Sequence, residues 1–406
     1  MTKRIGLGAV VLASVALAAP GTASAKQWPS LSAESAILIE PSSGEVIYSR
    51  NPYSRHAIAS TTKMMTALLV LEKRSLQHHI RVTNYHPSPA ESTAGLKPGE
   101  RLTTADMVRA LLLASANEAA ASIAVDVGGS QDGFVRMMNA RARRAGLRRT
   151  HFSNAIGLDS ASNYSTARDL ASLGILLRRN WFARLVMARS KATLESGSHK
   201  RVVQNRDNLI GSVPWMNGIK TGHTSAAGYL LVGGASRDGA ELISVVTGER
   251  SEAARNADTL KLMRFGFGRY HLVRAVSKGQ RLATVAVTGE SSKISLVAAS
   301  GVDVVMRVGH KPQVVLSSVP AELAGPIAKG AHIGYALVRR EGKVVDRVTL
   351  VAATAVAAPS VLALGGSWRG PIAGLFGIGM VLLLFANLKR RRSHVRRAAT
   401  TFNGPA

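Results

Sequence analysis

The sequence predicts an α+β domain over residues 31–270, followed by a small all-β domain over residues 271–355. In the first segment, short β-type runs lead, helical runs fill the middle, and strands return before a closing helix. That order is expected when an antiparallel sheet joins both ends of a domain. In the second segment, short alternating runs are separated by Gly, Pro, Lys and Ser. The chain has 406 residues, enough for two domains of roughly 100–200 residues each, and its 46% hydrophobic content argues against disorder.

The elements of the first domain follow from local patterns. Strands 36–39 and 46–48 enclose a Pro-Ser-Ser-Gly turn, which indicates a hairpin. Helical patterns are predicted at 58–72, 103–114, 118–127, 132–144 and 166–179. Thr103 with Asp106 three residues later is typical of a helix start, because the hydroxyl can accept from the backbone N–H at that spacing. Later elements are strands at 219–221, 229–233 and 242–247, and a closing helix at 253–265.

The second domain is predicted to consist of short strands only. Such spacing favours a β-sandwich or barrel. The expected strands are 282–287, 294–298, 302–308, 313–316, 333–337 and 344–350. No acid, base and nucleophile cluster in this segment. We therefore expect it to act as a spacer or docking domain.

Both ends of the chain predict export and tethering. Residues 1–25 combine Lys3 and Arg4, an apolar run and Ala-Ser-Ala, the pattern of a cleaved signal peptide. A linker at 356–370 leads to 371–388, which would measure roughly 27 Å as a helix and so about span a hydrocarbon core. The basic tail 389–406 should stay cytoplasmic. We therefore expect location at the cell membrane, with a single-pass C-terminal anchor and an extracytoplasmic (periplasmic) first domain.

Composition restricts the partners and the chemistry. The formal net charge is +28, which favours polyanionic neighbours such as a cell-wall polymer or anionic lipid. Export argues against nucleic acid, since the basic surface would never meet the cytoplasm. The chain has no cysteine, so it has no disulfide, thiolate metal site or thiol nucleophile. We expect neither a cofactor nor a metal.

The first candidate catalytic pair is Ser60 and Lys63, in Ser60-Thr61-Thr62-Lys63. Residues three apart on a helix lie on the same face. The run after Lys63 is apolar on all sides except one threonine, so the helix should lie in the core. Burial would lower the pKa of Lys63 and make its neutral amine a base for the serine hydroxyl. The alternative is that Ser60 merely caps the helix while Lys63 extends to solvent.

Two further motifs supply polar groups. Ser115-Ala116-Asn117 stands between apolar helical runs, where a hydroxyl can relay a proton and an amide can hold a substrate carbonyl. Without other evidence this motif is more often a capped interhelix turn. Lys220-Thr221-Gly222 falls on a predicted strand. Its cation and hydroxyl suit a terminal carboxylate and its glycine leaves room for a ligand, although a lone tripeptide of this kind is often an edge-strand turn.

Each motif is weakly informative alone, but the three together, in this order, form a specific pattern. SxxK, SxN and KTG in this order match the signature of serine β-lactamases and penicillin-binding proteins, except that Ala116 stands where aspartate occurs in that signature. The chain resembles low-molecular-mass penicillin-binding proteins of the D-alanyl-D-alanine carboxypeptidase family. The likeness continues through Leu96-Lys97-Pro98-Gly99-Glu100, residues 164–169 and Gly218 to Thr224. It covers about 31–270 closely and 271–355 more loosely.

The resemblance implies a transpeptidase/β-lactamase-like fold and the removal of the terminal D-alanine from peptidoglycan stem pentapeptides through an acyl-enzyme. It also implies that β-lactam antibiotics are covalent inhibitors. The resemblance also implies a role for each matching residue. Ser60 would be the nucleophile and Lys63 the proton acceptor, assisted by Ser115 and Asn117. Lys220 and Thr221, beside Gly222, would bind the terminal carboxylate, and the backbone N–H groups of Ser60 and His223 would form the oxyanion hole. Arg255 on the last predicted helix could assist with the carboxylate, the alternative being a solvated surface arginine.

Other functions remain compatible with the same residues. A D,D-endopeptidase or a β-lactamase could use this scaffold, although no glutamate is placed like the deacylating glutamate of class A β-lactamases. A different class of function is a catalytically idle tether that binds the wall through its basic face.

Overall fold

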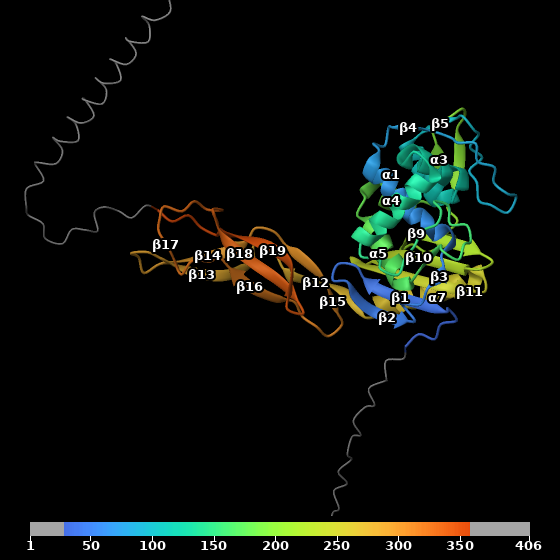
Figure 1. Cartoon of the computed structure of the whole chain (residues 1–406). Helices are drawn as coiled ribbons and strands as arrows, with labels where there is room; N and C mark the ends of the chain where they lie inside the picture. The colour runs from blue at the N-terminus through green and yellow to red at the C-terminus, as the bar shows by residue number, and fades with distance from the viewer. Residues whose placement is uncertain (1–27, 358–406) are drawn as a thin grey trace, which may run out of the picture. The chain divides into compact units, whose positions relative to one another are not determined.

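The computed structural model describes residues 28–357 (Figure 1). They form two compact units: the first contains residues 28–277, 301–315 and 337–347, and the second contains 278–300, 316–336 and 348–357. The predicted signal peptide, membrane span and basic tail lie outside the described residues, as does most of the predicted linker. Within 28–357, no helix has the length and apolar character that a membrane crossing requires.

A five-stranded antiparallel sheet forms the centre of the first unit, in the order β2-β1-β11-β10-β9. Its strands are β1 (Ser35–Glu40), β2 (Glu45–Arg50), β9 (Met216–Thr224), β10 (Gly228–Arg237) and β11 (Ala240–Glu249). Ala36 pairs with Val246, so the N-terminal hairpin joins strands from the far end of the domain. This confirms the prediction of an antiparallel sheet that contains both ends of the domain.

The sheet is covered on both faces, because successive side chains of a strand point in opposite directions. Ile37 and Ile39 belong to the larger apolar core beneath the helical cluster. Leu38 belongs to a second core with Leu262 of α7 (Glu252–Phe267), the predicted closing helix. Figure 1 shows α7 and α5 beside the same sheet. Apolar side chains on both faces of β1 therefore pack against helices on each side of the sheet, and the unit has three layers.

The helical cluster follows the predicted periods with local differences. Its members are the 3₁₀ turn η1 (Ala59–Thr62), α1 (Lys63–Lys73), α2 (Thr104–Arg109), the π turn η2 (Ala110–Ala114), α3 (Asn117–Gly128), α4 (Gln131–Arg144), α5 (Ala167–Arg178) and α6 (Trp181–Met187). Thr103 caps α2 by accepting from the Asp106 N–H at 3.2 Å, as predicted. The helix predicted at 58–72 is instead a 3₁₀ turn followed by an α-helix, and the one at 103–114 ends in a π turn. The short helix α6 was not predicted.

Three short strand pairs brace the loops of this unit. They are β3 (His56–Ala57) with β6 (Tyr164–Ser165), β4 (His79–Arg81) with β5 (Arg101–Thr103), and β7 (Lys191–Leu194) with β8 (Arg201–Gln204). These pairs were not predicted, since two to four residues are too few to show a period.

From residue 270 to 352 the chain forms only strands. β12 (Tyr270–Val276) pairs with β15 (Val302–Arg307). A six-stranded sheet has the order β16-β18-β19-β14-β13-β17. Its strands are β13 (Arg281–Val287), β14 (Lys293–Ala298), β16 (Gln313–Ser317), β17 (Glu322–Leu323), β18 (His332–Arg340) and β19 (Lys343–Ala352). All six predicted strands are present, and β12 and β17 are additional.

Candidate active site

Ser60 lies in the 3₁₀ turn that leads directly into α1. The residue before it, Ala59, has a φ of +44°, a conformation that costs a non-glycine residue about 1–3 kcal/mol. Ala59 is buried, so the surrounding structure holds this strained turn in place. The turn sets Ser60 at the entrance to a helix whose first eight residues are all buried.

Lys63 is completely buried, with an exposed fraction of 0%, as the apolar run after it predicted. Its Nζ donates to Asn117 Oδ1 at 2.6 Å, to the Ile156 carbonyl at 2.6 Å and to Ser60 Oγ at 3.1 Å. The alternative in which Lys63 extends to solvent is therefore wrong. The structure brings together Ser60, Lys63 and Asn117 from the first two motifs.

These three partners determine what Lys63 can do. A carbonyl oxygen and an amide oxygen can only accept, so both need an N–H from the amine. When the amine is neutral it has two N–H groups and one lone pair. The Ile156 carbonyl and Asn117 take the two N–H groups, and the lone pair is left for the Ser60 hydroxyl. The geometry thus makes the neutral amine an acceptor of the Ser60 proton.

The surroundings favour that neutral form. Burial lowers the pKa of Lys63 well below its usual range, and the nearby cation of Lys220 lowers it further. Glu91 and Glu118 act in the opposite direction on this pKa, and the guanidinium of Arg206 again lowers it. The burial of Lys63, which has no directly paired carboxylate within residues 28–357, therefore dominates its pKa.

Asn117 is oriented by a carboxylate that the sequence did not reveal. Its Nδ2 donates to Glu91 Oε2 at 2.6 Å, which leaves Oδ1 facing Lys63. The Tyr85 hydroxyl donates to the same Glu91 oxygen, and the Ser88 N–H donates to Oε1 at 3.0 Å. Burial raises the pKa of Glu91, but these hydrogen bonds outweigh it and the net pKa is lowered. Glu91 is thus an anionic acceptor that fixes the amide of Asn117.

Ser115 occupies the break between the π turn η2 and α3. It has a φ of +60° and an exposed fraction of 2%. Its Oγ has no hydrogen-bond partner among residues 28–357. A buried hydroxyl normally has a partner. Both its donor and its acceptor capacity therefore remain available to a bound molecule.

The loop over residues 154–158 packs against the turn that carries Ser60. Asn154 Oδ1 accepts from three successive backbone N–H groups, those of residues 156, 157 and 158, at 3.1, 2.6 and 3.1 Å. This arrangement presents the Ile156 carbonyl to Lys63. Gly157 has a φ of +97°, and a Cβ there would lie 2.0 Å from the Ala59 carbonyl oxygen. The absence of a side chain at Gly157 lets this loop contact the turn that carries Ser60.

Replacing Gly157 with alanine should therefore displace the nucleophile. We expect Gly157→Ala to lower the rate of covalent labelling by fluorescent penicillin at least about tenfold and to lower Tm, because backbone atoms must move to relieve the clash. The matched control is Gly146→Ala, which has a φ of +74° but no heavy atom within 4 Å of the added Cβ. It should lose only the roughly 1 kcal/mol of the backbone conformation and keep full labelling. Equal labelling rates in the two variants would contradict this role of Gly157.

The third motif lies on β9, the edge strand of the sheet beside η1. A Cβ at Gly222 would lie 3.2 Å from the Ala59 Cβ, so glycine lets the strand approach the nucleophile turn. Lys220 is buried, and its Nζ donates to the Thr221 carbonyl at 3.0 Å. Burial lowers the pKa of Lys220 to about 7, and the Arg206 guanidinium contributes to the lowering. Within residues 28–357 Lys220 has no anionic hydrogen-bond partner, so its ammonium can donate to an anionic group of a ligand.

His223 and Arg255 complete the predicted set. The His223 ring stacks on Tyr229, with 3.9 Å between ring centroids, so the imidazole is held at the strand pair. Arg255 has an exposed fraction of 2%, and the surface-arginine alternative is therefore wrong. Its guanidinium donates to Asn256 Oδ1 at 2.7 and 3.1 Å and lies close enough to Lys220 to lower the pKa of that lysine.

A cleft of about 380 Å³ opens over these groups. Its lining includes Ser60, Glu91, Asn117, Asp159, His223 and Thr224. Ser115, Lys220 and Arg255 are buried and do not line it directly. The serine, the amide of Asn117 and the end of β9 therefore line one cleft.

Sequence reasoning missed Glu91, the Ile156 carbonyl and Arg206. No motif marks Glu91, since it lies 26 positions before its partner in an irregular loop. Every residue has a backbone carbonyl, so the sequence does not indicate that the one of Ile156 contacts Lys63. Arg206 is exposed, yet its charge acts on both Lys63 and Lys220, and Arg206 N–H donates to the Leu113 carbonyl at 3.1 Å. Only the folded arrangement reveals these three groups.

Together, the strained serine turn, the buried lysine and the amide define a serine hydrolase in which a lysine, instead of a histidine, faces the nucleophile. Comparison with known proteins gives the family. The chain belongs to the D-alanyl-D-alanine carboxypeptidase family, whose sequence profile matches residues 22–251. Residues 270–358 match the profile described as the C-terminal domain of penicillin-binding protein 5.

Individual relatives agree with this assignment. D-alanyl-D-alanine carboxypeptidase DacF of Bacillus subtilis is 31% identical over 321 residues, 77% of this chain and 82% of that protein. DacA of Escherichia coli is 32% identical over 344 residues, 80% and 83% of the two chains. The crystal structure of penicillin-binding protein 5 from Haemophilus influenzae has a TM-score of 0.58 at 27% identity and covers 82% of this chain and 99% of its own. The protein is a serine-type D-Ala-D-Ala carboxypeptidase with a transpeptidase-like domain and a C-terminal β domain.

Proposed function

We propose that the protein removes the terminal D-alanine of peptidoglycan stem pentapeptides through an acyl-enzyme on Ser60. The neutral amine of Lys63 takes the Ser60 proton as Oγ attacks the carbonyl of the penultimate D-alanine. The C–N bond to the terminal D-alanine then breaks, and the leaving amine receives a proton that Ser115 can relay from Lys63. A water molecule then gives a proton to the neutral Lys63 as its oxygen attacks the acyl carbonyl, the ester bond to Ser60 Oγ breaks, Oγ takes the proton back, and the shortened peptide leaves.

The other groups have supporting roles in this proposal. The terminal carboxylate binds near Lys220 and Thr221, with Arg255 and Arg206 adding positive charge. The backbone N–H groups of Ser60 and His223 receive the negative charge that develops on the carbonyl oxygen, a contribution typically worth about 2.7–4 kcal/mol per donor. The observation that carries the proposal is the hydrogen-bond set of Lys63, because its two acceptor-only partners leave the lone pair for Ser60.

Two measurements test the acyl-enzyme. Mass spectrometry should detect free D-alanine after incubation with a synthetic pentapeptide. Peptide mapping after reaction with penicillin should locate one adduct, on Ser60. An adduct on another residue, or pentapeptide that stays intact while penicillin reacts, would contradict the proposal.

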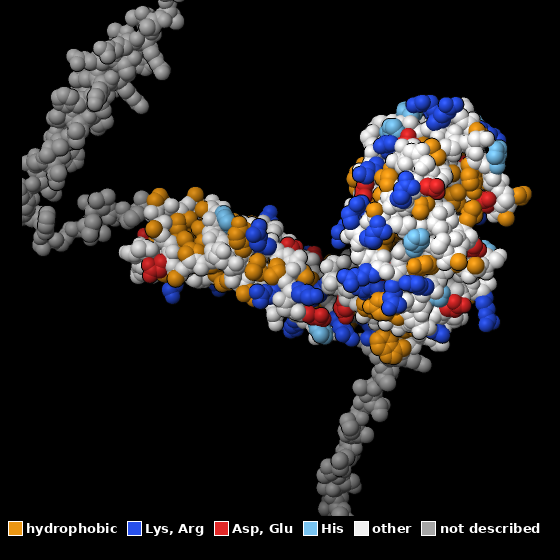
Figure 2. Space-filling model, viewed as in Figure 1, with side chains coloured by type: hydrophobic (Ala, Val, Ile, Leu, Met, Phe, Trp, Pro, Cys, Tyr) orange, Lys and Arg blue, Asp and Glu red, His pale blue; other side chains and the backbone are white. Residues whose placement is uncertain are grey.

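We also propose that this enzyme acts outside the cytoplasm, tethered to the membrane by its C-terminal segment. The sequence patterns of residues 1–25 and 371–388 support this location. Lys and Arg side chains are spread over the visible face of the described chain (Figure 2), which suits an anionic wall or membrane surface. Cell fractionation should place the full chain with membranes and a chain ending at residue 370 in the soluble extracytoplasmic fraction. A membrane-bound truncated chain would refute the C-terminal anchor.

A further inference from the structure

A hollow of about 750 Å³, which we call the arginine pocket, lies between the loop before β3 and the segment after α4. Arg55, Arg148 and Arg149 line it together with residues 51–54, and no carboxylate of the described chain is among its lining groups. None of these residues lines the catalytic cleft, and none belongs to the three sequence motifs. The pocket is therefore a second feature of the first unit, separate from the catalytic site.

Hydrogen bonds hold the two sides of the pocket in place. His151 and Tyr164 exchange backbone hydrogen bonds of 2.9 and 3.0 Å, which join the segment after α4 to β6. Arg149 connects this segment to the loop over residues 51–54, because its Nη1 donates to the Tyr53 carbonyl at 3.2 Å. The arginines therefore stand on two segments that are fixed to each other.

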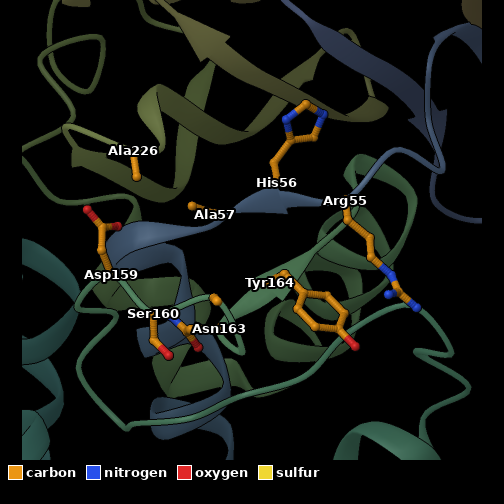
Figure 3. A pocket seen from close by; sticks show the side chains of 9 residues that line it. Arg55, His56, Ala57, Asp159, Ser160, Asn163, Tyr164 and Ala226 are labelled. Atoms are coloured by element: carbon orange, nitrogen blue, oxygen red, sulfur yellow. The ribbon is translucent and has the colours of Figure 1, made fainter.

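Aromatic rings position two of the three guanidinium groups. The Arg55 guanidinium lies 4.5 Å from the centroid of the Tyr164 ring, and the Arg149 guanidinium lies 5.8 Å from the centroid of the Tyr53 ring. Figure 3, a view of a neighbouring hollow that Arg55 also lines, shows the Arg55 side chain beside the Tyr164 ring and directed away from Asp159. A guanidinium that lies over a ring keeps the N–H donors at its edge available. The rings thus restrict these two side chains without using their donors.

The positive charge of the arginine pocket is not neutralised within the described chain. Among residues 28–357, none of the three arginines forms an ion pair. Arg149 has one side-chain hydrogen bond, to a backbone carbonyl, and within the same residues Arg55 and Arg148 have none. The carboxylate of Asp169 accepts from the Arg149 backbone N–H at 2.9 Å and from the Thr150 hydroxyl at 2.7 Å. The three guanidinium groups can therefore donate to an anion of another molecule.

The composition of the pocket favours phosphate as that anion. A guanidinium can donate two parallel hydrogen bonds to a carboxylate or to a phosphate. Three positive charges exceed what one carboxylate neutralises, whereas a phosphate group has up to about two negative charges and enough oxygens for more than one guanidinium. Among the described lining residues only Pro52 and Tyr53 are apolar, and helices that bind a bilayer surface insert Trp, Phe or Leu side chains. A hydrophilic phosphate-bearing molecule therefore fits the pocket better than a lipid surface does.

We propose that the arginine pocket binds the phosphate groups of a phosphodiester-linked anionic polymer. The formal net charge of +28 favours such a polyanionic neighbour. The arginines act in binding only, and no bond is made or broken in the pocket. Because the pocket and the catalytic cleft share no lining residue, this inference does not depend on the proposed function.

Three soluble probes test the pocket on the purified full chain: a glycerol phosphate trimer, an N-acetyl triglutamate amide of the same charge, and dihexanoyl phosphatidylglycerol below its micellar concentration. Calorimetry should give a Kd for the trimer at least about fivefold lower than for the peptide. The double variant Arg55→Gln/Arg148→Gln should raise the Kd of the trimer about tenfold, because two charge-assisted contacts are lost. Arg149 is left in place, since it also holds the Tyr53 carbonyl.

Arg136→Gln/Arg184→Gln is the matched control, because it removes the same charge from two exposed arginines that line neither the arginine pocket nor the catalytic cleft. It should raise the Kd of the trimer less than twofold, and the Tm of each double variant shows whether it is folded. An equal loss of affinity in both folded variants would mean that net charge alone attracts the trimer. Equal affinity for trimer and peptide would mean that phosphate is not selected, and tighter binding of the lipid would assign the pocket to a lipid headgroup. Each of these three results would overturn the proposal.

Discussion

Replacing Ser60 with alanine should abolish covalent labelling by fluorescent penicillin and lower D-alanine release from a pentapeptide by more than about a thousandfold. The reason is chemical: alanine has no oxygen on which an acyl group can form. The side chain is small, and its hydroxyl accepts a 3.1 Å hydrogen bond from Lys63. Gel fluorescence and mass spectrometry of D-alanine measure the two effects.

Ser212→Ala provides the control, because Ser212 is an exposed serine outside the cleft whose hydroxyl donates to the Asn208 carbonyl. It should label at the wild-type rate. Persistent labelling in Ser60→Ala, in a variant that melts at the wild-type Tm, would remove Ser60 as the nucleophile.

Replacing Lys63 with methionine should slow acylation by about a hundredfold to ten-thousandfold, the range expected when a general base is lost. Methionine fills a similar volume in the buried position but has no lone pair basic enough to take the Ser60 proton. The matched control is Lys73→Met on the same helix, where the lysine is exposed. Labelling rates of both variants measure the effect, and wild-type labelling in Lys63→Met would contradict the lysine base.

The pH profile of the wild type gives an independent reading of the same lysine. Below its pKa Lys63 is an ammonium and cannot accept a proton, so kcat/KM should rise with pH through a pKa well below the usual lysine range. Lys220 has a pKa of about 7, and the loss of its charge above that pH should weaken carboxylate binding, so kcat/KM should fall again. A profile that begins to rise only near pH 10 would show that the base is an ordinary solvated lysine.

Much of the fold could be predicted because the signals were local. A short apolar β-type run before a turn marked β1, alternating side chains marked the strands after residue 270, and the uniformly apolar run after Lys63 marked a buried helix. Burial of Lys63 followed from that run alone. By contrast, the 3₁₀ turn before α1 and the π turn after α2 depend on how buried helices meet each other, which no helical period encodes.

The residues of the candidate site likewise fall into a group that the sequence predicted and a group that it did not. Ser60, Lys63, Asn117 and Lys220 were found because their spacing is regular and each chemical type is informative. Glu91 and Asp159 were missed because their partners, Asn117 and Thr224, lie 26 and 65 positions away. Arg255 gave no signal of burial, since a charged residue on an amphipathic helix is ordinarily exposed.

The contact between Lys63 and the carbonyl of Ile156 has an evolutionary consequence. A main-chain oxygen survives every substitution of the residue that bears it, provided that the local chain path is retained. Homologues could therefore replace the isoleucine freely and keep the amine oriented, whereas a change at Asn154, which shapes that path, would disturb it. A sequence alignment would show position 156 as variable, although its carbonyl orients the lysine that we propose as the base.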